Sequence, residues 1–137
     1  MKNKSLLSQY SIRKTRPRLQ IISVIGKFKN RHFSVEEVLK GLRRGKSKVS
    51  RASAYRAINL FSQKGLLRPI DLGKGFLLYE RASQKSHHDH LYCINCGKII
   101  EFKDQSIEKL QMKVCRKKRF HPKSHTLRIT GLCKECL

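Results

Sequence analysis

Two C-x-x-C pairs constrain the fold of this chain more than any other feature. Cys93 and Cys96 form the first pair, and Cys133 and Cys136 form the second, far along the chain. Four thiolates suit tetrahedral zinc in a closed structural site. One such pair alone could be a redox dithiol, but two pairs separated by a helix and strands are better explained by zinc. The fold is therefore expected to bring both pairs together.

The length of the chain makes a structural metal useful. A sequence of 137 residues allows one or two small domains, and domains of that size have hydrophobic cores of limited stability. The fifth cysteine, Cys115, lies next to Val114 on a predicted helix and is interpreted as a small, at least partly buried apolar residue rather than a ligand. No secretory feature opens the sequence, so the paired cysteines indicate metal ligands in a reducing compartment, and a cytoplasmic location is expected.

The charge of the chain narrows its function. Lys and Arg number 32 against 9 Asp and Glu, which gives a formal net charge of +23, and zinc bound to four thiolates would lower it only to about +21. Such a charge is typical of nucleic-acid binders, although it could also serve solubility or attraction to anionic membranes. A membrane role is disfavoured, because the sequence has no apolar run near 18 residues and no basic amphipathic helix with a bulky apolar face.

Helical periodicity predicts three helices in the first half of the chain. The first begins after Thr15, with Pro17 in its first turn. Ser34 and Glu37 form a capping box before the second helix, and Ser50 caps the third. The apolar residues expected to face the core are Ile21, Ile22, Ile25, Phe28, Val35, Val38, Leu39, Leu42, Ala54, Ala57, Ile58 and Phe61.

A basic hairpin is expected to follow these helices. Residues 66–72 and 76–80 are predicted strands around a glycine-flanked turn with Lys74 at its tip. Helices followed by such a hairpin predict a winged helix, and a plain helical bundle with a solvated basic face is the alternative. The third helix would enter the major groove, while the wing and the basic segment at Arg13 would contact phosphates or the minor groove. The predicted DNA contacts are Arg13, Arg51, Ser53, Tyr55, Arg56 and Lys74.

The second half of the chain has a different pattern and is expected to form a separate domain. A polar hinge at residues 82–86 divides a domain of residues 1–82 from one of residues 83–137. Strands are predicted at residues 88–92, 98–102 and 124–130, with a helix capped by Asp104 whose Ile107, Leu110 and Val114 face inward. The predicted class is therefore α+β, with a winged helix-turn-helix domain followed by a small α/β dimerisation domain. One apolar sheet face of the smaller domain would need a second copy to cover it.

The motifs together resemble the ferric uptake regulator family over nearly the whole chain. The resemblance rests on residues 15–18, on the helix at residues 51–59, and on the His87-His88-Asp89-His90-Leu91 run followed by residues 93–102. It implies a homodimer with N-terminal winged helices and C-terminal dimerisation domains. It also implies binding to an A+T-rich inverted repeat, and repression of metal homeostasis genes when a divalent metal is bound.

The resemblance also implies which residues hold metal. It assigns Cys93, Cys96, Cys133 and Cys136 to structural zinc, in agreement with the chemistry of the pairs. The implied regulatory site consists of His32, Glu80, His88, His90 and Glu101, and the implied second site of His87, Asp89, Glu108 and His125. Alternate residues of a strand point to opposite faces, so one short run can serve both of these sites. Singly, His32 and Glu80 read as exposed polar loop residues.

The identity of the sensed metal is less constrained. Imidazole and carboxylate ligands accommodate iron(II), manganese(II) and zinc(II). Within the resemblance, zinc sensors tend to use a cysteine and peroxide sensors tend to use aspartate, so Glu80 and Glu101 favour iron(II). A peroxide- or zinc-sensing member of the same family and a constitutive zinc-ribbon nucleic-acid binder remain alternatives. An enzyme is not expected, because neither H-E-x-x-H nor H-x-E with P-C-x-x-C occurs in the sequence.

Overall fold

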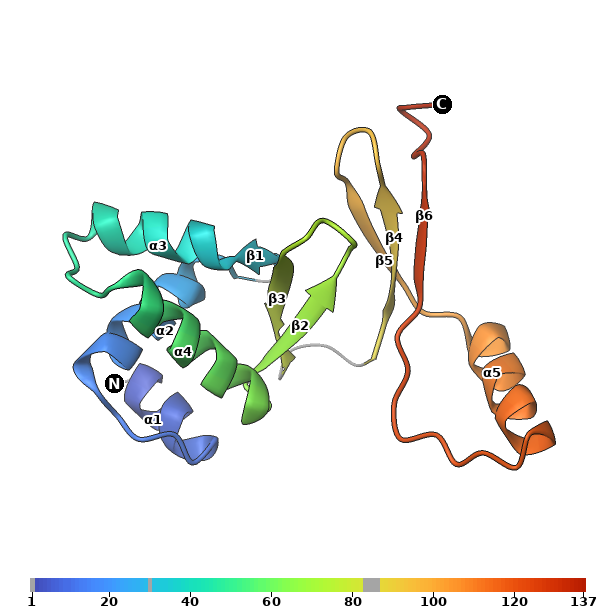
Figure 1. The fold of residues 1–137 in the computed structure, drawn as a ribbon, viewed down its shortest axis with the longest axis horizontal. Coiled ribbons are helices and arrows are strands. Elements are labelled where there is room, and N and C mark those ends of the chain that lie inside the picture. Colours follow the sequence, from blue (N-terminus) through green and yellow to red (C-terminus); the bar gives the residue numbers. More distant parts are fainter. Residues whose placement is uncertain (1, 30, 83–86) are drawn as a thin grey trace. The chain divides into compact units, whose positions relative to one another are not determined.

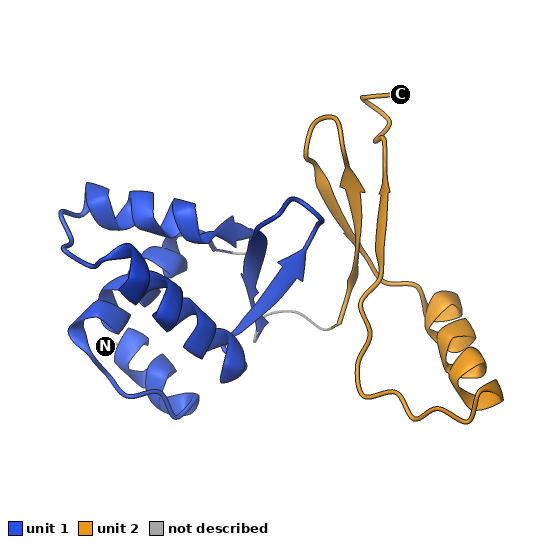
Figure 2. Ribbon diagram, in the orientation of Figure 1, with its two compact units in different colours: residues 1–85 blue, residues 86–137 orange. Residues whose placement is uncertain are grey.

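The chain is divided into two compact units, each with its own sheet. The computed structural model describes residues 2–29, 31–82 and 87–137, and the units comprise residues 1–85 and 86–137 (Figure 2). Helices and sheets together give the predicted α+β class. Residues 83–86 of the predicted hinge lie outside the described residues, and the predicted boundary after residue 82 stays a prediction.

Four helices make up most of the N-terminal unit (Figure 1). They are α1 (Lys2–Gln9), α2 (Arg16–Lys27), α3 (Val35–Arg44) and α4 (Arg51–Gln63). The helix predicted after Thr15 is capped by Thr15 itself, and Ser50 caps α4 as predicted. Each side chain accepts a backbone N–H of the first turn, at 3.4 Å and 3.1 Å. At α3 the capping box is complete, because the Ser34 N–H donates to Glu37 Oε2 at 2.8 Å and the Glu37 N–H donates to Ser34 Oγ at 3.2 Å. Local sequence therefore fixes where these three helices begin.

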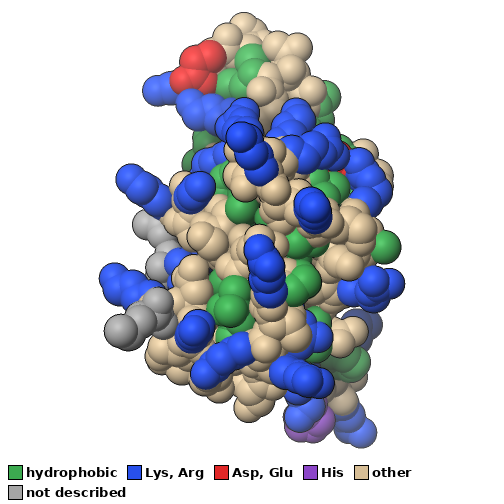
Figure 3. Space-filling model, turned by 90° about the vertical axis from the view of Figure 1, so that its left-hand side faces the viewer, with side chains coloured by type: hydrophobic (Ala, Val, Ile, Leu, Met, Phe, Trp, Pro, Cys, Tyr) green, Lys and Arg blue, Asp and Glu red, His purple; other side chains and the backbone are tan. Residues whose placement is uncertain are grey.

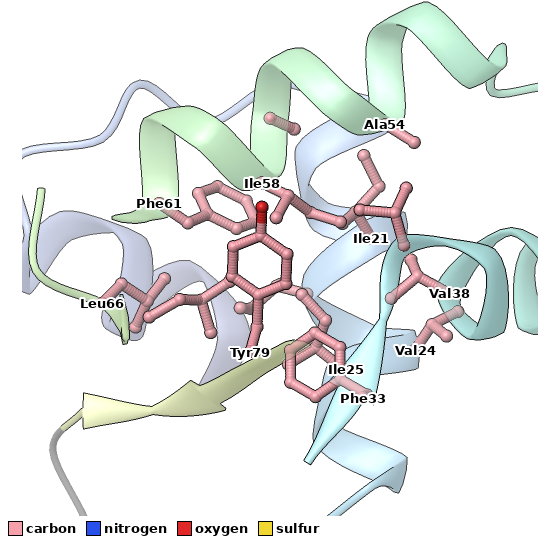
Figure 4. Close-up of a cluster of buried hydrophobic side chains, with 14 of the residues drawn as sticks. Ile21, Val24, Ile25, Phe33, Val38, Ala54, Ile58, Phe61, Leu66 and Tyr79 are labelled. Atoms are coloured by element: carbon pink, nitrogen blue, oxygen red, sulfur yellow. The ribbon is translucent and has the colours of Figure 1, made fainter. Parts of the chain in front are cut away.

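The apolar faces of α2, α3 and α4 meet in one core (Figure 4). All the side chains predicted to face it are buried, except Phe28, which is partly buried and packs against the cluster. Phe33 and Tyr79 enter the same cluster from the sheet. Gly41 lets α2 and α3 approach closely, since a Cβ there would lie 2.5 Å from Val24 Cγ1.

The sheet of the N-terminal unit contains the predicted wing. Its strands are β1 (Phe33–Ser34), β2 (Leu67–Asp71) and β3 (Leu77–Arg81), all antiparallel in the order β1-β3-β2. In the turn between β2 and β3, Gly73 and Gly75 have φ of 74° and 83°, which glycine adopts without a Cβ penalty. Asp71 Oδ1 accepts the Gly73 N–H at 2.8 Å. The prediction of a winged helix is confirmed.

Two short elements of the N-terminal unit were not predicted from the sequence. Helix α1 has eight residues, and the two-residue strand β1 pairs with β3. Elements this short show little periodicity and gain most of their stability from packing. In α1 that packing is provided by Leu7, which is completely buried in the core.

The C-terminal unit is a three-stranded sheet with one helix. Its elements are β4 (Asp89–Cys93), β5 (Ile99–Phe102), α5 (Gln105–Lys117) and β6 (Arg128–Gly131). The strand order is β5-β4-β6, with β4 antiparallel to β5 and parallel to β6. Asp104 caps α5 as predicted, because its Oδ1 accepts two backbone N–H groups at 2.8 Å and 3.2 Å. The third strand begins at Arg128, later than the predicted residue 124, so His125 lies before the strand.

The prediction that α5 turns Ile107, Leu110 and Val114 inward is wrong for the described chain. None of the described α5 residues is buried, and Leu110 and Val114 are 61% and 60% exposed. Ile129 of β6 is also 49% exposed. Helical periodicity identifies an apolar face but not what covers it. Within this one chain the apolar face of α5 is left open to solvent.

Candidate metal centres and DNA-reading surface

The two C-x-x-C pairs meet at one end of the C-terminal sheet. Their four Sγ atoms lie within 4.8 Å of one another. The parallel pairing of β4 with β6 brings the two turns together, and the Ile94 N–H donates to the Gly131 carbonyl at 3.0 Å. Tetrahedral zinc with bonds of about 2.3 Å would place its sulfurs about 3.8 Å apart. The Cys96 and Cys133 sulfurs are 3.7 Å apart, so the cluster fits a zinc ion.

Local electrostatics prepare this cluster for metal. Backbone N–H groups of Cys96 and Cys133 point at the Cys93 sulfur and lower its pKa to about 6, which favours the thiolate that zinc binds. Next to the cluster, Lys98 Nζ donates to Glu135 Oε1 at 3.1 Å. This ion pair joins the first turn to the second and was not predicted from the sequence.

A second cluster is formed by His87, Asp89, Glu108 and His125, whose ligand atoms also lie within 4.8 Å of one another. The two histidine Nε2 atoms are 2.9 Å apart. His87 Nε2 lies 3.4 Å from Asp89 Oδ1 and 3.4 Å from Glu108 Oε1. His87 lies just before β4, Asp89 begins β4, Glu108 lies on α5 and His125 lies before β6. Together they bring two imidazoles and two carboxylates to one point.

Asp89 shows that this second cluster fits a cation. It is only 1% exposed, and neither of its carboxylate oxygens has a hydrogen-bond partner among the described residues. A buried carboxylate without such partners is costly unless a positive charge compensates it. Divalent metals are bound by this combination of imidazole and carboxylate. The four residues are therefore suited to holding one.

The opposite face of β4 carries a third group of ligands. The rings of His88 and His90 are 4.9 Å apart, and His88 Nε2 lies 3.8 Å from Glu101 Oε1. His90 pairs directly with Glu101 across β4 and β5. Alternate residues of the run from His87 to His90 separate as expected, because His87 and Asp89 belong to the second cluster. The use of the two groups as metal sites stays a prediction.

The N-terminal unit contributes the pair His32 and Glu80. His32 Nε2 lies 3.3 Å from Glu80 Oε2, and Glu80 is 3% exposed. The pairing of β1 with β3 holds them together, since their chain neighbours Phe33 and Tyr79 are register partners. Arg68 of β2 also contacts Glu80, with Nη1 3.2 Å from Oε1. Arg68 is the register partner of Glu80 on the neighbouring strand and was not predicted from the sequence.

The predicted DNA contacts are exposed or partly exposed on the N-terminal unit. Arg51, Tyr55 and Arg56 are exposed on α4, and Ser53 is partly exposed. Arg13 is exposed before α2, and Lys74 is exposed at the tip of the wing. Figure 3 shows Lys and Arg spread across one whole face, with few acidic side chains in view. Such a surface attracts nucleic-acid phosphates.

Comparison with known proteins identifies the family. A model of the ferric uptake regulator family matches residues 9–130. The chain belongs to the ferric uptake regulator family. The ferric uptake regulation protein of Bordetella parapertussis is 35% identical over 136 residues, covering 99% of this chain and 97% of that protein. Members of the ferric uptake regulator family are metal-responsive transcription regulators, and DNA-binding repression is their general role.

Solved structures of ferric uptake regulators share the fold. The iron-containing structure from Francisella tularensis has a TM-score of 0.82 and 31% identity, covering 91% of this chain and 94% of that one. The Helicobacter pylori regulator, described as having three functional metal-binding sites, has a TM-score of 0.79 and 32% identity. The match covers 97% of this chain and 87% of the Helicobacter pylori chain. Among the described residues of this ferric uptake regulator family protein, no helix is long and apolar enough to cross a membrane.

Proposed function

We propose that this protein is a cytoplasmic homodimeric repressor that binds an A+T-rich inverted repeat when loaded with iron(II) and controls metal homeostasis genes. The observation that carries the proposal is that neighbouring residues at and just before β4 belong to different ligand clusters. His87 and Asp89 serve one cluster, His88 and His90 serve another, and Cys93 at the end of the strand belongs to the thiolate cluster. Two of these sets offer the nitrogen and oxygen ligands of an exchangeable metal, and one offers those of a permanent zinc.

The sensing site is proposed to join His32 and Glu80 to His88, His90 and Glu101. A metal held by both sets would restrict movement between the DNA-binding and dimerisation domains, for which we propose residues 1–82 and 83–137. Without the metal, the two DNA-binding domains of a dimer would sample many separations. DNA affinity would then fall with the fraction of molecules in the arrangement that can bind DNA. The side chains proposed to hold this metal already form two groups. His32 contacts Glu80 in the N-terminal unit, and His88 lies beside His90 and Glu101 in the C-terminal unit.

Arg68 gives the sensing site a further property in this proposal. Arg68 compensates the negative charge of the buried Glu80 carboxylate. This carboxylate is therefore not an uncompensated charge before metal binds. Binding of a cation would then have to displace or tolerate the guanidinium. This competition would weaken the site and keep the metal exchangeable.

The choice of iron(II) rests on ligand chemistry. The proposed sensing residues are histidines and glutamates without cysteine, a set that oxygen- and nitrogen-preferring ions accept. Manganese(II), zinc(II) and a peroxide-sensing role of bound iron(II) are the competing assignments within the family. The second cluster of His87, Asp89, Glu108 and His125 is proposed to hold an accessory ion. The support is the buried Asp89 carboxylate, whose oxygens accept no hydrogen bond from the described residues.

The dimer is proposed from the open apolar surface of the C-terminal unit. Leu110 and Val114 of α5 and Ile129 of β6 are each at least 49% exposed. A twofold contact between C-terminal units would remove this surface from water and would stabilise the dimer by about 25 cal/mol for each square ångström buried.

DNA contacts are proposed for the N-terminal unit of each protomer. Bases or phosphates would be contacted from α4 by Arg51, Ser53, Tyr55 and Arg56. The DNA backbone or the minor groove would be contacted by Arg13 and Lys74.

The deciding experiment measures binding of the zinc-loaded protein to an A+T-rich inverted-repeat duplex by fluorescence anisotropy. It is done without oxygen, at fixed salt, with and without iron(II), manganese(II) or added zinc(II). We expect tight binding only with iron(II) or manganese(II), and loss of that response in His88→Ala. His121→Ala is the matched control, because His121 is exposed and outside the three ligand clusters. Equal binding with and without metal would instead support the constitutive zinc-ribbon alternative.

A further inference from the structure

Glu36 is an acidic residue at the DNA-reading side of a strongly basic protein. The chain has only 9 Asp and Glu against 32 Lys and Arg. Glu36 lies in the first turn of α3 and its side chain is 52% exposed. It faces Arg51, the first residue of α4, whose side chain is 54% exposed. A carboxylate at this position repels DNA phosphates, so its presence in a DNA-binding surface needs a physical explanation.

The contact between Glu36 and Arg51 uses both ends of each group. Arg51 Nη1 donates to Glu36 Oε1, and Arg51 Nη2 donates to Glu36 Oε2 at 3.3 Å. This is the fork-to-fork geometry in which a guanidinium binds either a carboxylate or a phosphate. The hydrogen bond from Arg51 lowers the pKa of Glu36, so the carboxylate is ionised at neutral pH. In the free protein Glu36 occupies the pair of N–H donors with which Arg51 could bind a phosphate in the same forked geometry.

The position of Arg51 makes this occupation consequential. Arg51 stands one helical turn before Tyr55 on α4, and both side chains are exposed on the surface proposed to bind DNA. An exposed ion pair of this kind contributes little to stability, because solvent screens it. It can therefore open when a phosphate offers the same geometry.

We propose that Glu36 acts as an intramolecular substitute for a DNA phosphate, holding Arg51 in the free protein and lowering its affinity for any duplex. The role rests on the proposed use of α4 in DNA binding. It counteracts the general attraction that a net charge of +23 creates. A weaker background affinity leaves room for metal loading to decide whether the protein is bound to DNA.

The test measures the affinity of Glu36→Gln for a random-sequence duplex as a function of salt. Glu36→Gln should bind more tightly on the order of tenfold at 0.1 M salt, and its log–log salt slope should steepen by about 0.9 for each α4 engaged, as one added phosphate contact predicts. Glu37→Gln is the matched control, since it removes the same charge from the same turn of α3. Glu37 pairs with Arg31, with Oε1 2.9 Å from Nη1, and not with α4. Its salt slope should stay near that of the wild type.

A double substitution separates release of Arg51 from loss of a negative charge. In an Arg51→Gln background, the gain from Glu36→Gln should shrink to that of Glu37→Gln. Equal effects of the two single glutamate variants, or weaker binding by Glu36→Gln, would overturn the inference. Circular dichroism spectra recorded at the assay temperature check that all variants are folded.

The random duplex keeps this inference distinct from the proposed function. A protein that shows the Glu36 effect but ignores metal and the inverted repeat would retain the phosphate-substitute role and lose the proposed repressor role. A protein that responds to metal but shows no Glu36 effect would do the reverse. Failure to bind any duplex at low salt would overturn both.

Discussion

At the scale of single residues, the thiolate cluster makes the clearest prediction. Cys133→Ser leaves three thiolates in a cluster whose geometry fits four-coordinate zinc. We expect its zinc content to fall from about one ion per chain towards none, with a loss of stability of about 3 kcal/mol or more. Metal analysis and thermal unfolding measure both effects. Cys115→Ser is the control, because Cys115 is partly buried and outside the cluster, and zinc loss there would contradict this assignment.

The capping box of α3 gives a pH-dependent prediction at the same scale. Burial raises the pKa of Glu37, but hydrogen bonds from Ser34 and Arg31 outweigh it and leave the pKa below its usual value of 4.5. A lowered native pKa stabilises the fold above pH 4.5, and this contribution is lost as pH falls through the native value. Glu37→Gln should cost up to about 1 kcal/mol at pH 7, discounted for solvent screening. Urea unfolding should show this difference shrinking as the pH falls below 4.5 and the carboxylate is protonated, and a constant difference would contradict it.

At the scale of secondary structure elements, the close approach of α2 and α3 can be tested with two glycines. Gly41→Ala would place a Cβ 2.5 Å from the stiff, buried Val24 side chain, and we expect a loss of about 1–3 kcal/mol. Gly26→Ala, in α2, meets nothing within 4 Å and should gain about 0.5–1 kcal/mol from helix propensity. Chemical denaturation of both variants measures the contrast. Equal changes would show that α2 and α3 are not closely packed at Gly41.

The open face of α5 makes a second prediction at this scale. Leu110 is 61% exposed in the described chain, so Leu110→Ser should hardly change the stability of one C-terminal unit. If α5 lies in the dimer interface, the same change should raise the dimer dissociation constant on the order of tenfold or more. Sedimentation velocity measures the effect, with Lys109→Ser as a control on the same helix. An unchanged dimer would place the interface elsewhere.

At the scale of the whole molecule, metal binding is proposed to restrict the movement of the two units. Loading of a zinc-containing protein with manganese(II) should narrow the distribution of interatomic distances in small-angle scattering, because one ion would join ligands of both units. His88→Ala should keep the broad distribution at every metal concentration, and His121→Ala should narrow like the wild type. A wild-type distribution that does not respond to metal would contradict the hinge mechanism.

Features that depend on local chemistry could be predicted from the amino-acid sequence. Caps at Thr15, Ser34 and Ser50 mark the helix starts, the glycine-flanked turn marks the wing, and alternation along β4 assigns histidines to two faces. These signals act within a few residues, where backbone hydrogen bonding and side-chain period fix the result. The spacing of the cysteines likewise predicted the four thiols that the structure brings together, because ligand type and number are chemical properties of the residues.

Contacts between residues far apart in the sequence could not be predicted in this way, because they depend on the three-dimensional packing of the chain. The β4–β6 pairing brings the cysteine pairs together, and packing against the core forms α1. The contacts of Arg68 with Glu80 and of Glu36 with Arg51 join different elements, and no local pattern encodes them. The exposed face of α5 depends in the same way on what covers it. Contacts between distant segments depend on how the apolar faces pack, and periodicity describes one face at a time.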